Sequence, residues 1–261
     1  MYRELLALSW PSWRAYRVWQ RNLDSYRRYY WASLVGNLGE PFLYLLAMGY
    51  GLGSYIGEIE GMSYLQYLAP GLLVSSAMFA ATFEGTYGTY LRMAHLKTYE
   101  AILATPLTLQ DVVLGDLLWA TTKGLISGLI MLLVLLPFGL LPSPWALLLP
   151  LVLIVVGLLF SALAMVVAAL SPNWEFFNYY LTLFISPMFF FSGVFFPLTN
   201  FPSWVKGVSA FLPLTYAVAL SRALTMGEVS VSLLAPLLWM LLPTLLFGCI
   251  SLSLIRRRII K

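Results

Sequence analysis

The chain has 261 residues, of which 61% are hydrophobic and 10% are charged, and its net charge is +4. Soluble domains carry about 25% charged residues, and several apolar runs here reach the roughly 20 residues that cross a bilayer. The composition therefore predicts an all-α polytopic membrane protein without a soluble domain. The positive-inside rule explains the basic residues near both ends, so no nucleic-acid partner is expected.

The first 31 residues are predicted to form a cytoplasmic helix that lies in the membrane interface. Aromatic and apolar side chains recur there every three or four residues, and arginines follow the same spacing on another face. A helix with these two faces lies along the membrane surface with its apolar face in lipid. The apolar face holds Tyr16, Trp19, Leu23, Tyr26 and Tyr30, and the basic face holds Arg14, Arg17, Arg21 and Arg28.

Residues 32–261 are predicted to form one transmembrane domain of six helices. The apolar runs place these helices near residues 34–55, 65–90, 112–136, 145–170, 177–196 and 233–255. Arg92 and Lys97 follow the second helix, and arginine clusters precede the first helix and end the last one. Because Lys and Arg concentrate on the cytoplasmic side, both termini are expected in the cytoplasm.

The loop after the second helix contains a short amphipathic segment at residues 95–104, which Thr105 and Pro106 interrupt. A short helix across one membrane face would let a partner subunit push on the spans. A simple connector would show the same pattern, so the sequence pattern leaves both readings open.

Ionisable residues inside apolar runs are rare and are hypotheses of function by default. Glu40 begins the first span and Glu84 lies in the inner half of the second. Glu84 is expected either to line a transport pathway or to make a hydrogen bond between helices. Asp116 and Lys123 lie two turns apart on the third span, which predicts a structural ion pair.

Aromatic residues gather at the outer end of the fifth span, where Phe189, Phe191 and Phe195 are the candidates for a gate in the transport pathway. Packing or an interfacial aromatic belt would need the same residues.

The segment from Pro197 to Gly227 is apolar but carries Pro202 and Pro213. Irregular backbone at membrane depth is tolerated only where protein buries it or where it lines a cavity. We therefore predict a re-entrant pair of short helices on the outer side, one before and one after Pro213, because proline suits the first turn of a helix.

Several kinds of chemistry are missing from the sequence. It contains no GxxxxGK[ST] phosphate loop, no HExxH motif, no Cys/His cluster and only one histidine, His95. No metal site and no catalytic residues are expected, and a conduit is favoured over an enzyme.

Three stretches of the chain carry a family resemblance. They are SGVFFPL, LPLTYAVALSRAL and KTYEAILATPLTLQDVVLGDLLWATTKG, and Tyr64, Leu68, Pro70 and Gly71 add to the pattern. The chain resembles the permease subunits of type-2 ABC exporters over nearly its whole length. The third stretch is particularly similar to the branch of that family that exports lipo-chitin oligosaccharides.

The resemblance implies a homodimer in which each permease recruits one nucleotide-binding ATPase subunit. ATP and Mg²⁺ would bind to that partner, and this chain would hold no cofactor. In the family, the segment matching residues 95–106 contacts the ATPase. The coupling residues implied here are His95, Lys97, Tyr99, Glu100, Leu103, Thr105 and Pro106.

The resemblance further implies export across a bacterial inner membrane of a lipid-linked or acylated oligosaccharide, or of another amphipathic substrate. The alternative is an ATP-independent secondary transporter or channel, which would carry more paired intramembrane charges and half-helices that meet at the midplane.

Overall fold

The computed structural model describes residues 12–259, apart from the side chains of residues 32, 34, 37, 38, 40 and 41. The first eleven residues of the expected interfacial segment and the side chain of Glu40 therefore lie outside the described part. Within it the protein is all-α, as predicted, with one small antiparallel hairpin formed by β1 (Glu58–Ile59) and β2 (Met62–Ser63).

Among residues 12–259, four helices are long and apolar enough to cross a membrane. The first contains α5 (Tyr64–Phe83) with the π-helical turns η2 (Glu84–Gly88) and η3 (Leu91–His95). The second is α7 (Leu109–Leu135), extended by η4 (Leu136–Phe138). The others are η5 (Pro144–Leu148) with α8 (Leu149–Leu170), and η8 (Val231–Leu233) with α13 (Leu234–Ile259).

The six predicted spans are only partly supported. The segment expected as the first span consists of α3 (Tyr30–Leu46), η1 (Ala47–Leu52) and α4 (Gly53–Ile56). The segment expected as the fifth consists of α9 (Glu175–Tyr180), η6 (Leu181–Ile185) and α10 (Ser186–Phe191). Neither is among the four helices long and apolar enough to cross, and the count rises to five only when one bent pair is counted as a span.

The bent pair is α11 (Ser203–Ser209) and α12 (Pro213–Met226), which meet at 85°. Pro213 is the first residue of α12, where its missing N–H leaves no helical hydrogen bond unmade. A short turn, η7 (Leu198–Asn200), precedes the pair. The structure therefore contains one helix before Pro213 and one that begins at it, and the re-entrant path of this pair stays a prediction.

The core of the bundle is formed by α5, α7 and α8, which approach closely through small residues. A Cβ atom on Gly124 of α7 would lie 2.9 Å from the carbonyl oxygen of Ala77 on α5. A Cβ atom on Gly157 of α8 would lie 3.1 Å from the carbonyl oxygen of Thr121. Small residues allow helices to pack tightly where lipid supplies no hydrophobic driving force between them.

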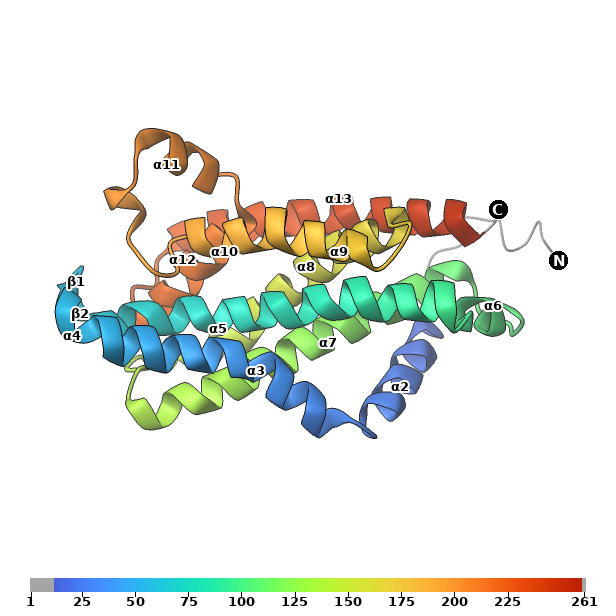
Figure 1. Ribbon diagram of the computed structural model, residues 1–261, viewed down its shortest axis with the longest axis horizontal. Helices are drawn as coiled ribbons and strands as arrows, with labels where there is room; N and C mark the ends of the chain where they lie inside the picture. Colours follow the sequence, from blue (N-terminus) through green and yellow to red (C-terminus); the bar gives the residue numbers. More distant parts are fainter. Residues whose placement is uncertain (1–11, 260–261) are drawn as a thin grey trace.

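The bundle has two distinct ends (Figure 1). One end carries α2 (Ala15–Tyr26), α6 (Thr98–Leu103) and the last turn of α13. The other end carries α4, the β1–β2 hairpin and α11. The expected coupling loop and the expected re-entrant pair therefore lie at opposite ends of the molecule.

Helix α2 lies within the first 31 residues, which were expected to form one interfacial helix, and its buried face includes one of the expected aromatic residues, Tyr26. Its buried residues are Ala15, Val18, Asn22 and Tyr26, which form a stripe one turn apart, whereas Tyr16 is exposed. This stripe lies on α7, where a Cβ atom on Gly115 would come within 2.7 Å of the Ala15 carbonyl oxygen. The small residues decide which face packs against protein.

Candidate functional site

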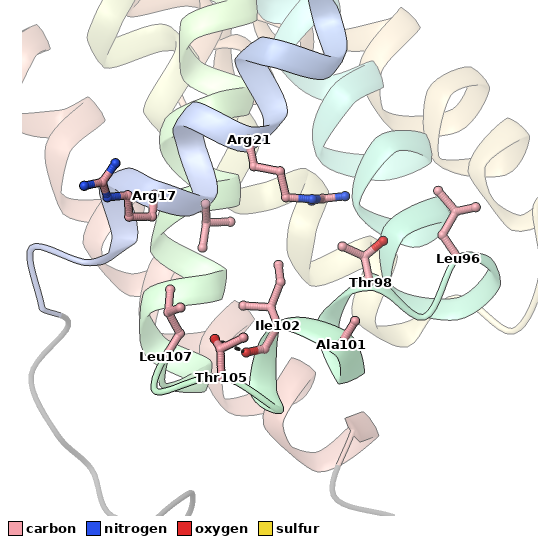
Figure 2. A pocket seen from close by; sticks show the side chains of 9 residues that line it. Arg17, Arg21, Leu96, Thr98, Ala101, Ile102, Thr105 and Leu107 are labelled. Atoms are coloured by element: carbon pink, nitrogen blue, oxygen red, sulfur yellow. Dashed lines mark hydrogen bonds between the residues drawn. The ribbon is translucent and has the colours of Figure 1, made fainter.

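A cleft of about 410 Å³ lies between α2 and α6 at one end of the bundle (Figure 2). Val18, Ile102 and Leu107 supply apolar side chains to its lining, and Arg17 and Arg21 supply basic ones. Figure 2 shows the Arg21 side chain reaching from α2 across the opening toward Thr98, while the Arg17 guanidinium points outward. The cleft suits a partner surface that is apolar in its middle and acidic at its edge.

The shape of this cleft depends on how α6 begins and ends. Lys97 adopts a left-handed backbone conformation with φ of 48°, which separates α6 from the helix that ends at His95. After α6, the Thr105 hydroxyl donates to the Ile102 carbonyl at 2.6 Å and closes the turn. Arg14 of the N-terminal segment then donates to the Pro106 carbonyl at 2.7 Å, which ties the two walls together.

The start of α7 fixes the other side of the cleft. Thr108 and Asp111 form a reciprocal capping box at the N-terminus of α7. Asp111 also accepts a hydrogen bond from the Ser12 backbone N–H at 2.6 Å. Residues almost a hundred positions apart thus meet at one helix terminus.

Beneath the cleft, the carboxylate of Asp116 on α7 is fully buried and accepts three hydrogen bonds. The Tyr99 hydroxyl donates at 2.5 Å, Arg92 Nε at 3.0 Å and Asn22 Nδ2 at 2.6 Å. These donors come from α6, η3 and α2, so one carboxylate joins three elements. Burial, and next the nearby negative charge of Asp116, raise the pKa of Tyr99 well above its ordinary value, so Tyr99 remains a donor at cellular pH.

The same network continues along α5 and α7 to Glu84. Arg92 Nη1 donates to Glu84 Oε1 at 2.6 Å, and Lys123 Nζ donates to Glu84 Oε2 at 3.0 Å. Gly88 makes room for this carboxylate, because a Cβ atom there would lie 2.3 Å from Glu84 Oε1. We call the set Glu84, Arg92, Tyr99, Asp116 and Lys123 the charge cluster. Its two acids and two bases balance, which buried ions require.

The expected pairing of Asp116 with Lys123 needs correction. Asp116 pairs with Arg92, and Lys123 pairs with Glu84. Both residues still tie helices together, but each does so through a partner on the long helix that contains α5. Sequence reasoning missed Arg92, which was counted only as a cytoplasmic positive charge. Its spacing of eight residues from Glu84, about two helical turns, was the available signal.

The seven expected coupling residues lie in α6 or next to its ends, and their side chains have different surroundings. Tyr99 points inward to Asp116, and Glu100 on the same helix is exposed. His95 stacks on Trp174 with ring centroids 4.9 Å apart. Leu103 is half-buried against apolar neighbours below the cleft. The remaining three, Lys97, Thr105 and Pro106, shape the two ends of α6.

Residues expected on the interfacial helix also contact the protein. Trp19 Nε1 donates to Thr122 Oγ1 on α7 at 2.9 Å. Arg21 Nη1 donates to Asn22 Oδ1 at 3.1 Å, beside the charge cluster, and partial burial lowers the pKa of Arg21. The hydrogen bonds of Trp19 to Thr122 and of Asn22 to Asp116 place α2 against α7 as a wall of the cleft.

The aromatic candidates cluster at the opposite end of the bundle. Phe189 and Phe195 are buried with ring centroids 5.0 Å apart, and Tyr44 contacts both rings edge-on. Phe191 instead lies half-buried beside Phe201. Glu84, expected on the same pathway, has Arg92 and Lys123 as its partners and belongs to the charge cluster.

A bundle of long apolar helices with a charge cluster at one end and an aromatic cluster at the other defines a multi-pass membrane protein. The chain belongs to the ABC-2 type transporter family, whose sequence pattern matches residues 15–226. The resemblance to type-2 ABC exporter permeases is thereby confirmed, and the chain is a permease component of a membrane transporter.

Individual relatives agree with this assignment. Nodulation protein J of Sinorhizobium fredii is 37% identical over 253 residues, covering 95% of each chain. Nodulation protein J of Rhizobium meliloti is 40% identical over 225 residues, covering 85% of each chain. The inner membrane transport permease YadH of Escherichia coli is 23% identical over 218 residues, covering 82% of this chain and 83% of its own.

Proposed function

We propose that this chain is the membrane-spanning subunit of an ATP-driven exporter. Two copies form the pathway, and each copy docks one nucleotide-binding ATPase subunit in the cleft between α2 and α6. ATP and Mg²⁺ bind to that ATPase. The observation that carries the proposal is the direct link from this cleft, through Tyr99 of α6, to the buried charge cluster between the long helices.

The cleft end of the molecule is the cytoplasmic end in this proposal. It carries Arg14, Arg17, Arg92 and the arginines at the end of α13, whereas Glu58 and Glu60 lie at the hairpin end. Cytoplasmic placement of the basic end agrees with the positive-inside rule and gives both termini a cytoplasmic position. The bacterial inner membrane is the proposed location, which the relative YadH supports by its name.

Six crossings complete this arrangement. The helix formed by α3, η1 and α4 and the helix formed by α9, η6 and α10 would each cross, giving six spans with the four long helices. The pair α11 and α12 would then dip into the outer face and return, because a seventh crossing would move the arginines of α13 to the outside. The 85° bend between them suits a re-entrant pair.

The docked ATPase would act on the bundle through α6. Its apolar residues would insert beside Val18 and Ile102, and acidic residues would approach Arg17 and Arg21. Movement of α6 would pull on the Tyr99–Asp116 hydrogen bond and so on Arg92 and Glu84. A network with every charge paired transmits such a movement, because breaking one bond leaves a buried ion uncompensated.

The proposed cargo is a lipid-linked or acylated oligosaccharide, or another amphipathic glycolipid. The aromatic cluster around Phe189 and Phe195 supports it, because ring faces suit sugars and apolar surfaces suit acyl chains. In the resting state the same cluster would serve as the gate at the outer end.

The docking proposal is tested with two matched substitutions on one short segment. Ala101 is exposed and lines the cleft, whereas Ala104 is exposed and lies outside its lining. The permease is coexpressed and copurified with a candidate phosphate-loop ATPase subunit. We expect Ala101→Arg to reduce the copurified ATPase at least tenfold and Ala104→Arg to leave it unchanged.

Equal retention of the ATPase in both variants would contradict docking in the cleft. Transport by the permease alone, without any ATPase, would favour the secondary transporter instead. ATPase stimulation of the intact complex, measured over a panel of glycolipids and hydrophobic drugs, identifies the substrate class.

A further inference from the structure

Arg222 is a half-buried cation on α12, far along the chain from the charge cluster. Its Nη2 donates to the Tyr67 carbonyl at 3.2 Å and to the Gly193 carbonyl at 3.0 Å. Its guanidinium carbon lies 3.7 Å from the centre of the Tyr67 ring, a close cation–π contact. Arg222 therefore joins α12 to α5 and to the turn after α10.

The chemistry of this contact differs from that of the charge cluster. Among the described residues, no carboxylate oxygen lies within 4.0 Å of Arg222. Carbonyl dipoles and an aromatic ring hold the cation instead, and its Nε–H is buried without a partner in that part of the chain. Because the acceptors are neutral carbonyls and carry no full negative charge, these hydrogen bonds are easier to exchange than those of a buried ion pair.

The Gly193 carbonyl lies in the turn that connects the two buried gate phenylalanines. Gly193 has φ of 75°, a conformation that other residues rarely adopt, and its carbonyl also accepts from the Tyr67 hydroxyl at 3.2 Å. The next residue, Val194, packs so tightly that a Cβ atom on Gly71 would lie 3.1 Å from its Cα. Phe189 before the turn and Phe195 after it pack against each other.

We propose that Arg222 is the positioning residue of the outer gate. By holding the Gly193 carbonyl, it keeps the turn against α5 and so keeps Phe195 on Phe189. A displacement of α12 relative to α5 withdraws the guanidinium, and the turn that carries Phe195 is then free to move. The inference rests on the proposed transport function and names the residue on which closure of that pathway depends.

The test measures access to the turn from the outer side. Ser192 is buried next to Gly193, and its hydroxyl has no partner among the described residues. Ser192→Cys should therefore disturb the turn little while its thiol reports access to it. The reporter is placed in a Cys249→Ser background, which removes the chain's single cysteine. An impermeant maleimide is applied to right-side-out vesicles, and the rate of labelling is recorded without ATP.

We expect Arg222→Gln to raise the labelling rate at least tenfold. Arg222→Lys keeps a cation that can donate to a carbonyl but loses the planar guanidinium that stacks on Tyr67, so it should restore part of the protection. Lys206→Gln, which removes an exposed cation on α11, should leave the rate unchanged. Rescue by lysine separates positioning of the turn from a general loss of packing.

An unchanged rate in a folded Arg222→Gln protein would overturn the proposal, as would equal labelling of the lysine and glutamine variants. Should Arg222→Gln fail to fold, Arg222→Met, which also removes the hydrogen bond to the Gly193 carbonyl, takes its place, and a rate equal to the parent's would then overturn the proposal. The ATPase takes no part in this measurement. Failure of cleft docking and failure of the gate proposal are therefore distinguishable.

Discussion

The two ends of the bundle hold their helices together by different means. At the cleft end, two carboxylates and two cations join α2, α6, α7 and the helix containing α5. At the hairpin end, aromatic rings pack around Phe189 and Phe195, and the cation Arg222 is held by carbonyls rather than by an acid.

This difference matches the different tasks that we propose for the two ends. A balanced ionic network has few alternative partners, so it keeps its geometry and passes on a displacement. Aromatic contacts have no fixed donor or acceptor and tolerate sliding at small energetic cost. A rigid coupling end and a yielding gate end therefore follow from the two chemistries, and four substitutions test this contrast.

The largest effect is expected from Asp116→Asn. The variant leaves Arg92 and Tyr99 without their shared anionic acceptor in a buried site. Removing one partner of a buried ion pair costs about 3–5 kcal/mol of the free energy of unfolding. Thermal denaturation in detergent measures the loss. Asp24→Asn is the control. Asp24 forms an exposed ion pair with Arg27, so this substitution should leave the stability unchanged. Equal stability of the two variants would mean that the buried ion pairs do not stabilise the cleft end.

The next effect concerns the fit of α2 on α7. In Gly115→Ala the new Cβ atom would lie 2.5 Å from Val18 Cβ and 2.7 Å from a backbone oxygen, so α2 must move. Overpacking of this kind costs about 2–3 kcal/mol. We expect lower stability together with less copurified ATPase, because the cleft wall shifts. Gly248→Ala on α13 meets no atom within 4 Å and should lower neither quantity.

At the gate end, Phe195→Ala is expected to cost less than Asp116→Asn. Lipid supplies no transfer term for an apolar side chain, so mainly the cavity and lost packing remain, about 2 kcal/mol. Passive leak of a small dye from proteoliposomes should rise while ATPase copurification stays normal. Phe184→Ala removes a half-exposed ring and provides the control. A larger loss of stability in Phe195→Ala than in Asp116→Asn would reverse our ranking of the two ends.

The smallest effect is expected from Arg258→Gln at the end of α13. Arg258 Nη1 donates to the carbonyls of Ala168, Ala169 and Ser171, and so caps the C-terminus of α8. Loss of this cap should cost about 1 kcal/mol. The exposed neighbour Arg257 carries the same charge, so Arg257→Gln should leave the melting temperature unchanged. Equal shifts would mean that charge near the membrane matters here and capping does not.

Much of the fold was readable from the sequence because bilayer thickness and apolar runs constrain helix position strongly. The expected helices near residues 65–90, 112–136, 145–170 and 233–255 correspond to the four long helices, and Pro213 begins α12. The break at Thr105 and Pro106 was also readable, since Thr105 closes the turn after α6. The number of crossings did not follow in the same way, because α3 and α10 belong to segments that are not among the four long apolar helices.

The sequence by itself determined the class of molecule, the helices and the supply of charged and aromatic residues. Periodicity describes one helix at a time and does not say which helices become neighbours. Only the tertiary structure decided that Asp116 pairs with Arg92, that Lys123 pairs with Glu84 and that α2 packs through Ala15 and Val18. These choices depend on the close approach of backbones at glycines and on the requirement that every buried charge find a partner.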